Sequence, residues 1–386
     1  MASRIPDASL VTPAPPGALA ARFLAWYDRH RRHLPWRMAP GTPSDPYRVW
    51  VSEVMLQQVR VETVARHYAP FLERWPTVEA LAAAPLEEVL RGWSGLGRYA
   101  RAHNLHACAR LLVERHEGRL PEDEAALRAL PGVGPYTAAA IRAIAFGRGD
   151  ALPPVDGNVE RVVARLFALG WEPGTPDTRR RAELRRFAAS LAPDGRPGDH
   201  AQAIMDLGAT VCVPRRPRCG ACPVQDACAA RALGVADTLV LGPKRAPRPK
   251  RYATAFWVSR PEDGAVLLRR RPMKGPLGGT LEPPSTEWRP RRAWRAAEAI
   301  SAGALPFAAD WRRLPGRVRH ALSSYEVEFA VMTAADVPRA LDTMDGAVWV
   351  GREHLEGEAL SSLARKLVRH ALAATRPRAI RHRRRA

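Results

Sequence analysis

The sequence predicts a mainly α-helical chain that ends in a smaller α+β domain. Through residues 18–235, apolar side chains recur three or four positions apart, and Pro and Gly stand where helices must end. After residue 251, short β-branched and aromatic runs alternate with turn residues, as they do in strands. Between the two patterns, four cysteines within residues 212–228 predict a metal site.

The chain is strongly basic. Its 386 residues carry a formal net charge of +21, which predicts a polyanionic partner, either nucleic acid or an acidic membrane surface. No apolar run reaches the length of about 18 residues that spans a bilayer, and residues 1–17 lack the apolar core of a secretory signal. We therefore expect a cytoplasmic protein with no membrane association, in which thiols stay reduced.

The helical domain is expected to span residues 18–235, after a disordered N-terminus at residues 1–17 that is rich in Pro and Ala. Its clearest helices are predicted at residues 18–30, 85–97 and 156–170, together with a pair joined by a tight turn within residues 124–147.

A basic, proline-rich linker at residues 236–251 is predicted to separate the two domains. The α+β domain, residues 252–375, is expected to end in a helix, and residues 376–386 form a basic tail that we expect to be disordered and attracted to phosphate. The predicted strands fall within residues 252–260, 265–272, 325–333 and 347–355, and the helix within 361–376.

The cysteine loop has the spacing C-x6-C-x2-C-x5-C, formed by Cys212, Cys219, Cys222 and Cys228. Four thiolates in one short loop can bind either zinc or a [4Fe–4S] cluster. Zinc ribbons use two separated C-x2-C pairs, whereas here one such pair lies between single cysteines. The spacing therefore favours the cluster and leaves zinc as an alternative.

Three arginines, Arg215, Arg216 and Arg218, lie between the first two cysteines in a segment that prolines stiffen. A rigid basic loop suits contact with DNA phosphates. A solvated charge run is the alternative.

The turn within residues 130–141 contains Gly132, Val133 and Gly134, directly before a helix. Two glycines there can point backbone N–H groups outward at a helix start, which favours anions. The turn thus predicts a phosphate contact that is independent of sequence, and a plain helical corner is the alternative.

Two carboxylates are candidates for chemistry. Asp156 precedes a helix, where an Asp considered by itself is most often a simple cap. Glu53 lies among apolar residues of a half-buried helix, where burial disfavours an unpaired charge and raises the pKa of a carboxyl group. One acid that donates a proton and one that faces a cationic sugar are the groups that cleave a glycosidic bond.

Taken together, these residues resemble the adenine DNA glycosylases of the MutY family, in the helix-hairpin-helix superfamily. The resemblance runs from about Leu19 to the last helix. It implies helix-hairpin-helix glycosylase domains with a [4Fe–4S] loop, followed by a MutT-like (Nudix-like) domain. The motifs that carry it are LPWR (34–37), VWVSEVMLQQ (49–58), GLG (95–97), LPGVGPYTA (130–138), VDGNVERV (155–162), MDLGA (205–209) and the cysteine loop.

The resemblance implies a role for each catalytic residue. Glu53 would protonate an adenine flipped out of the duplex, and Asp156 would stabilise or capture the sugar cation. Asn158 and Tyr136 would hold the carboxylates and the sugar. Tyr136 stands where glycosylase-lyases similar to endonuclease III carry a lysine, so no Schiff base is expected.

The resemblance also implies the residues that contact DNA. Gln57 would reach into the base stack near the opposite base, next to Gln58. The adenine pocket would be lined by Arg32, Leu34, Trp36, Arg37 and Gln202. The second domain resembles the MutT-like domain that reads 8-oxoguanine opposite the adenine, which implies the same role here. It lacks the G-x5-E-x7-R-E-x2-E-E pattern, so we expect it not to hydrolyse nucleotides.

Three departures from the family pattern fall in segments that read the damaged base. Arg98 replaces an aromatic wedge, so that Tyr99 would supply a ring only after a backbone shift. Leu322-Ser323-Ser324 replaces F-S-H, which leaves Ser323 and Ser324 at the contact, and GTLEPPS (279–285) loses both aromatics of G-L-W-E-F-P. These departures predict that adenine excision is retained while discrimination for 8-oxoguanine is weakened or altered. The alternative is that these positions changed by sequence drift and that other residues compensate, so that discrimination is retained.

We therefore expect a monofunctional enzyme of base excision repair. It would remove adenine opposite 8-oxoguanine or guanine in double-stranded DNA, as a monomer associated with the bacterial nucleoid. One alternative is a helix-hairpin-helix glycosylase for another lesion or mismatch. The other is a non-catalytic iron–sulfur protein that binds DNA.

Overall fold

The computed structural model describes most of the chain. The described residues are 15–149, 154–171, 175–239, 247–273, 275–302, 305, 307, 309–322, 324–334 and 346–375. Ser323, the first fourteen residues, residues 240–246 of the linker and the predicted basic tail lie outside this part.

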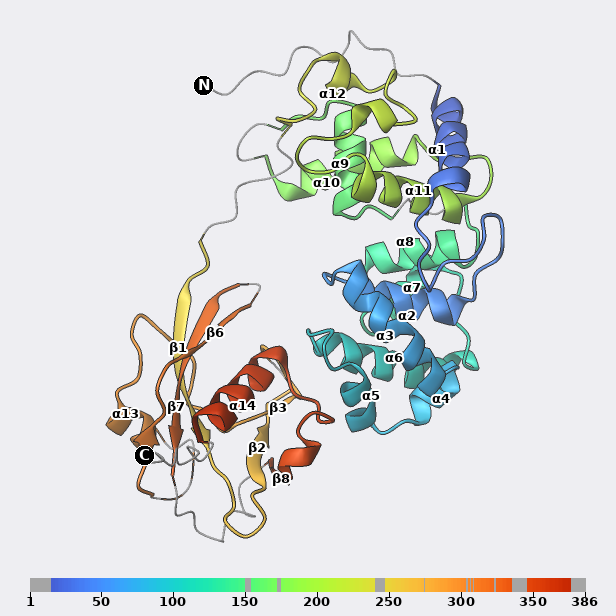
Figure 1. Ribbon diagram of the computed structural model, residues 1–386. Coiled ribbons are helices and arrows are strands. Elements are labelled where there is room, and N and C mark those ends of the chain that lie inside the picture. The colour runs from blue at the N-terminus through green and yellow to red at the C-terminus, as the bar shows by residue number, and fades with distance from the viewer. Residues whose placement is uncertain are drawn as a thin grey trace, which may run out of the picture. The chain divides into compact units, whose positions relative to one another are not determined.

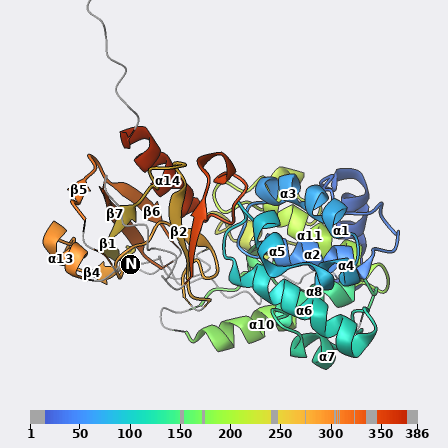
Figure 2. The ribbon, with the colours of Figure 1, turned by 90° about the horizontal axis from the view of Figure 1, so that it is seen from below.

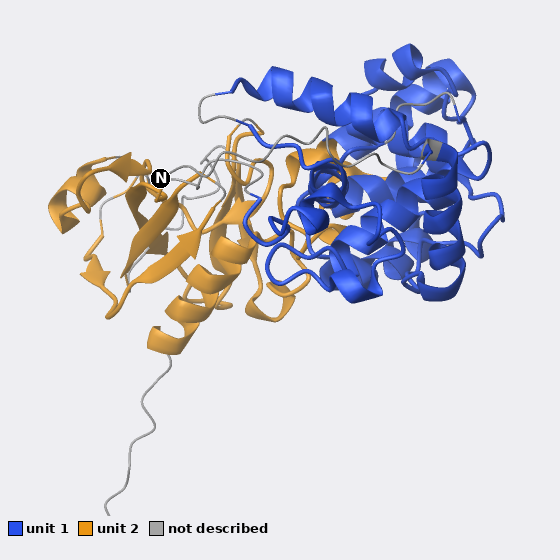
Figure 3. Ribbon diagram, turned by 90° about the horizontal axis from the view of Figure 1, so that it is seen from above, with its two compact units in different colours: residues 1–83, 104–245 blue, residues 84–103, 246–386 orange. Residues whose placement is uncertain are grey.

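The chain divides into two compact units (Figure 3). Unit 1 comprises residues 1–83 and 104–245, and unit 2 comprises residues 84–103 and 246–386. The boundary after residue 245 falls inside the predicted linker. Residues 84–103, predicted to belong to the helical domain, group with unit 2 instead.

Unit 1 is helical, as the sequence predicts (Figure 1). The first helix begins at Pro16, two residues before the predicted start of the helical domain. The helix α6 (Ala100–His116) begins in unit 2 and continues in unit 1. The other helices of unit 1 are α1 (Pro16–His30), α2 (Pro46–Leu56), α3 (Val61–Arg74), α4 (Val78–Ala83), α7 (Glu124–Ala129), α8 (Pro135–Ile144), α9 (Gly157–Leu166), α10 (Asp177–Ala189), α11 (Pro197–Thr210) and α12 (Ala229–Ala232), with a 3₁₀ turn at Cys219–Ala221.

Short-range chemistry sets where several of these helices begin. Asp45 accepts a hydrogen bond from the Arg48 amide (2.9 Å) ahead of α2, and Pro46 supplies a fixed φ at its first position. Asp156 caps α9 in the same way. The helix α11 then packs against α1, α8 and α9, so it brings together segments that are distant in the sequence.

The contact between α11 and α9 requires a glycine. A Cβ added at Gly208 would lie 2.7 Å from Asn158 Cβ and 2.8 Å from the Asn158 carbonyl oxygen. Gly208 thus lets α11 approach the beginning of α9, where Asp156 and Asn158 lie.

Unit 2 combines two sheets with helices. In its described residues, one sheet has five strands in the order β4-β1-β7-β5 with β6 also paired to β7, and the other has three in the order β3-β2-β8. The pairing of β1 with β7 is parallel and the other pairings are antiparallel. The elements are α5 (Leu86–Gly92), β1 (Lys250–Trp257), β2 (Val266–Arg270), β3 (Leu281–Glu282), β4 (Arg289–Pro290), α13 (Ala296–Ser301), β5 (Arg312–Arg313), β6 (Val318–Ala321), β7 (Glu326–Thr333), β8 (Ala347–Val350), a 3₁₀ turn at Arg352–His354 and α14 (Ser362–Thr375).

The helix α14 packs against β1 and β6, and α13 lies beside the edge strand β4 (Figure 2). Leu363, Leu367 and Ala371 of α14 are buried in one core with Trp257 and Phe329 of the strands. The four strands and the closing helix that the sequence predicts here are therefore confirmed, at β1, β2, β7, β8 and α14.

Two predictions about the surface of unit 2 are wrong. Tyr99 is only 1% exposed, and its hydroxyl donates to the Leu360 carbonyl oxygen (3.1 Å), which contradicts the prediction that its ring contacts DNA. Leu281 and Pro283, which replace the family's two aromatics, are also buried. Their substitution changes core packing rather than a surface that reads DNA.

We predict that Gly208→Ala lowers the free energy of unfolding by about 1–3 kcal/mol, because the new methyl group forces α11 away from Asn158. Chemical denaturation would measure the change. Gly17→Ala, in α1 with nothing within 4 Å of the new Cβ, is the matched control and should stay within about 0.5 kcal/mol of the parent. If the two variants were equally stable, the result would contradict the close approach of α11 to Asn158.

Candidate active site

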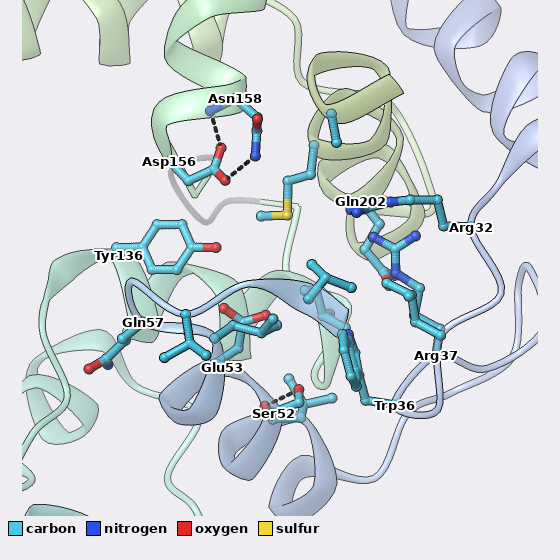
Figure 4. Close-up of a pocket in the computed structure, with 18 of the residues that line it drawn as sticks. Arg32, Trp36, Arg37, Ser52, Glu53, Gln57, Tyr136, Asp156, Asn158 and Gln202 are labelled. Carbon is cyan, nitrogen blue, oxygen red and sulfur yellow. Dashed lines mark hydrogen bonds between the residues drawn. The ribbon is translucent and has the colours of Figure 1, made fainter. Parts of the chain in front are cut away.

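One cavity of about 600 Å³ in unit 1 brings together most of the predicted site residues (Figure 4). Its walls come from α2 and the segment that leads to α3, from the loop between α1 and α2, from both ends of α8, from the start of α9, and from α11. The predicted residues that line it are Arg32, Leu34, Trp36, Arg37, Glu53, Gln57, Gln58, Tyr136, Asp156, Asn158 and Gln202.

Glu53 is a buried acid in α2, with 6% of its surface exposed. Burial raises the pKa of its carboxyl group to about 7, and the charge of Asp156 acts in the same direction. A hydrogen bond from Tyr136 and the charge of Arg37 oppose this rise. Within the described part of the chain, Glu53 Oε2 has no hydrogen-bond partner. The carboxyl group can therefore hold or release a proton near neutral pH.

Asp156 both caps α9 and faces the cavity. Its Oδ1 accepts hydrogen bonds from the Asn158 amide (2.9 Å) and the Val159 amide (2.8 Å). Its Oδ2 accepts from the Asn158 side-chain amide (2.9 Å) (Figure 4). Capping and a position in the site are thus not alternatives here, because capping fixes the carboxylate that the cavity presents.

Tyr136 lies at the start of α8, and its hydroxyl points into the space between the two carboxylates (Figure 4). Burial raises the pKa of Tyr136 well above 10, and the nearby charges of Glu53 and Asp156 add to this effect. The phenol therefore stays protonated and acts as a hydrogen-bond donor.

Arg161 connects the site to the cysteine loop. Its guanidinium donates to Asn158 Oδ1 (2.9 Å), to the Gly208 carbonyl oxygen (2.6 Å) and to the Cys212 carbonyl oxygen (2.6 Å). Asn158, which holds Asp156, is thereby tied to the loop that carries the thiols. The sequence gives Arg161 no role beyond its place in the VDGNVERV motif, because these contacts join residues up to 51 positions apart.

Other lining residues carry no chemical signal in the sequence. Val49, Val155, Ile144 and Met205 line the cavity as apolar side chains, and Ser52 lines it while its hydroxyl donates to the Val49 carbonyl oxygen (2.8 Å). Apolar periodicity predicts that such residues are buried, but it does not distinguish a cavity wall from a core.

The predicted phosphate-contact residues lie outside the cavity. Gly132 has φ of 78°, and a Cβ there would lie 2.8 Å from Asn104 Cβ, so only glycine fits the turn. Val133 is 5% exposed, and Gly134 is the N-cap of α8. Among all the described residues predicted to contact DNA, the exposed ones are Gln58, Gly132, Gly134, Arg215, Arg216 and Arg218 in unit 1, and Arg98 and Ser324 in unit 2.

The four loop thiols fit a cluster. Cys212, Cys219, Cys222 and Cys228 line one small cavity, and none forms a disulfide. The Arg165 guanidinium donates to Cys212 Sγ (3.3 Å), as expected beside a negatively charged ligand. Four thiols around one small cavity form a donor set that fits an iron–sulfur cluster. Such a cluster would crosslink four points of the loop.

Three segments of the chain match known protein families. Residues 51–186 match the HhH-GPD superfamily base excision DNA repair proteins, residues 212–228 the iron-sulfur binding domain of endonuclease III, and residues 254–370 the NUDIX domain. The adenine DNA glycosylase of Homo sapiens is 36% identical over 407 residues, which cover 91% of this chain and 73% of that protein. The chain belongs to the adenine DNA glycosylase family.

A bacterial adenine DNA glycosylase gives a second comparison. The enzyme of Mycolicibacterium smegmatis is 42% identical over 231 residues, covering 60% of this chain and 74% of that protein. This chain is a DNA N-glycosylase of base excision repair, and its cysteine loop is a [4Fe–4S] site. Neither alternative, a glycosylase for another lesion or mismatch or a non-catalytic iron–sulfur protein that binds DNA, is favoured by these matches.

The solved structure of a thermostable thymine-DNA glycosylase shares the fold of the helical region. It is 29% identical, covers 56% of this chain and 97% of its own, and superposes with a TM-score of 0.50. No helix in the described part of this adenine DNA glycosylase has the length and apolarity that a bilayer crossing requires.

We predict that Glu53→Gln stabilises the protein above neutral pH. The folded protein holds the Glu53 proton up to a pKa of about 7, whereas the unfolded chain releases it near 4.5, so stability falls as pH rises between these values. The glutamine variant avoids this loss, which amounts to about 3 kcal/mol. Denaturant unfolding at pH 4 and pH 8 would measure it, and a variant that gains nothing at pH 8 over pH 4 would contradict the raised pKa.

Proposed function

We propose that this adenine DNA glycosylase is monofunctional and removes adenine paired with 8-oxoguanine or guanine in double-stranded DNA. The observation that carries the proposal is that Glu53 and Asp156, 103 positions apart in the sequence, line one cavity with Tyr136 between them. Cleavage of a glycosidic bond needs two such groups at one substrate: a protonated acid that donates to the leaving group, and a charged carboxylate that faces the sugar.

The proposed reaction starts with a flipped adenosine in the cavity. Glu53 donates its proton to N7 of the adenine, and the bond between C1′ and N9 breaks with its electron pair passing to the base. A pKa of about 7 means that a large fraction of the protein carries this proton near neutral pH. The sugar is left as an oxocarbenium-like cation.

Asp156 then faces the cation. Its carboxylate, fixed by the capping hydrogen bonds of α9, stabilises the charge or captures C1′ covalently. Water then attacks C1′, and in the covalent route the bond between C1′ and Asp156 breaks with its electron pair returning to the carboxylate. The water gives a proton to the carboxylate form of Glu53, which restores the starting state of the protein. Tyr136 donates a hydrogen bond and does not attack, and no lysine is among the described residues that line the cavity. This arrangement supports hydrolysis without a Schiff base.

The proposed DNA surface lies around this cavity. The hairpin of Gly132, Val133 and Gly134 would offer backbone N–H groups to phosphate, apart from that of Val133, which donates to the Leu130 carbonyl oxygen (3.2 Å). The exposed arginines of the cysteine loop would contact the DNA backbone as well. The net charge of +21 supports such binding, and we expect one copy of the chain to act on each site.

We predict that Glu53→Gln abolishes adenine release, because the glutamine cannot supply the proton. Single-turnover assays on a duplex with adenine opposite 8-oxoguanine should show a loss of at least about 10³-fold, near the upper range for general acids. Binding to the same duplex, measured by gel shift, should stay within about threefold, because the residue keeps its shape. Full activity of the variant would refute the assignment of Glu53.

We further propose that discrimination for 8-oxoguanine is altered. Arg98 is exposed with a left-handed φ of 48°, in the place where the family carries an aromatic wedge, and Ser324 is exposed in the reader loop. His320 does not replace the missing histidine, because it is half-buried with its ring beside the Ser362 hydroxyl (3.4 Å). These two surface changes support the proposal, whereas the buried positions Leu281 and Pro283 do not contribute to it.

The ratio of adenine release opposite 8-oxoguanine to release opposite guanine tests this proposal. We predict that Arg98→Tyr raises the ratio by about tenfold, since base–aromatic stacking contributes about 1–3 kcal/mol per base. Arg98→Gln is the control that removes the charge without adding a ring, and it should leave the ratio low. A parent protein with a ratio as large as that of the Mycolicibacterium smegmatis enzyme, assayed side by side, would contradict the proposal.

A further inference from the structure

One wall of the active-site cavity is a loop with no helix or strand of its own. The described residues 31–45 connect α1 to α2, and Arg32, Leu34, Trp36 and Arg37 all project from this loop into the cavity. A loop of this kind holds a precise shape only if contacts from neighbouring elements fix it.

A single carboxylate on α11 makes several of those contacts. Asp206 is 0% exposed. Its Oδ2 accepts hydrogen bonds from the Arg32 amide (2.9 Å) and from Arg37 Nη1 (2.5 Å), and its Oδ1 accepts from Arg32 Nε (2.5 Å). The Arg37 side chain is itself only 4% exposed, so this is a buried, charge-assisted network.

We propose that Asp206 is a positioning residue of the glycosylase site, which fixes the loop of residues 31–45 against α11 and balances the charges of Arg32 and Arg37 beside Glu53. The inference rests on the proposed role of Glu53 as the acid. Asp206 does not itself line the cavity and acts through the two arginines.

The charge balance follows from which groups face one another. Glu53 is faced by Tyr136 from α8, by Asp156 ahead of α9 and by Arg37 from the loop. Asp206 is faced by Arg32 and Arg37, and by Tyr27 of α1. A cation beside Glu53 favours its ionised form, which cannot donate a proton. Asp206 offsets that cation and so helps Glu53 to remain an acid near neutral pH.

Asp206→Asn tests the proposal because it keeps the shape and removes the charge. The readout is the single-turnover rate of adenine release by the full-length, cluster-containing protein over a range of pH. Activity should fall as pH rises through the Glu53 pKa, and in the variant the midpoint of this fall should move down by about one pH unit. Above both midpoints the rate should drop by about tenfold. A folded variant with the parent midpoint would overturn the proposal.

Two further variants separate charge from simple loss of structure. Asp199, also on α11, accepts from the Gly41 amide (2.8 Å) and from Arg196 Nε (2.8 Å), and so holds the same loop at another point without lining the active-site cavity. Asp199→Asn should leave the midpoint unchanged, and an equal shift there would overturn the proposal. In the double variant Asp206→Asn with Arg37→Met, the cation that acts on Glu53 is gone, so the midpoint should return to the parent value or above. A midpoint that stays low would overturn the proposal.

Asp206→Glu covers the case in which the asparagine variant does not fold. It keeps the charge but is one methylene longer, so the midpoint should stay while the rate of base release falls by about tenfold or more through displacement of the loop. A parent-like rate would overturn the positioning role. Glu53→Gln keeps the tests distinct, because retained activity there refutes the proposed function, whereas an unmoved midpoint in Asp206→Asn refutes only the role of Asp206.

Discussion

A carboxylic acid kept away from water is the constraint on which this structure depends. Glu53 lies on a helix whose neighbouring side chains are buried, and the loss of hydration raises its pKa to about 7. Such an acid lowers stability at neutral pH, so the surrounding helices must offset its cost through their own packing. The buried Arg37 guanidinium lies near this acid and favours its ionised form. Its pairing with the Asp206 carboxylate limits that influence, so the pKa of Glu53 stays raised.

The proposed mechanism needs the second carboxylate, Asp156, in its charged form, whereas it needs Glu53 in its protonated form. In the proposed reaction the Asp156 carboxylate faces a cation, and its place at the start of α9 supplies two backbone N–H groups that hold this carboxylate in position. The cysteine loop contributes at a distance, because Arg161 joins the Cys212 carbonyl oxygen to Asn158, the partner of Asp156. A [4Fe–4S] cluster bound in this loop would therefore also help to hold Asn158 and Asp156 in place.

The residues proposed to recognise the opposite base are different from those proposed to cleave the glycosidic bond. Glu53 and Asp156, the two proposed catalytic residues, belong to unit 1, whereas Arg98 and Ser324, the proposed reader positions, belong to unit 2. Changes at those exposed positions can alter discrimination without disturbing Glu53 or Asp156. Leu281 and Pro283 show the limit of comparing motifs alone, since their burial makes them part of the core of unit 2 and removes them from the question of specificity.

The sequence by itself determined the helical half, the α+β half, the cysteine loop and the two acids. Each of these is set by local periodicity, by capping chemistry or by a short motif. Only the tertiary structure decided that Tyr99 is buried, that residues 84–103 group with unit 2, and that Arg161 and Asp206 support the site. These outcomes depend on contacts between segments far apart in the chain, such as the 174 positions between Arg32 and Asp206, and no local pattern encodes such a contact.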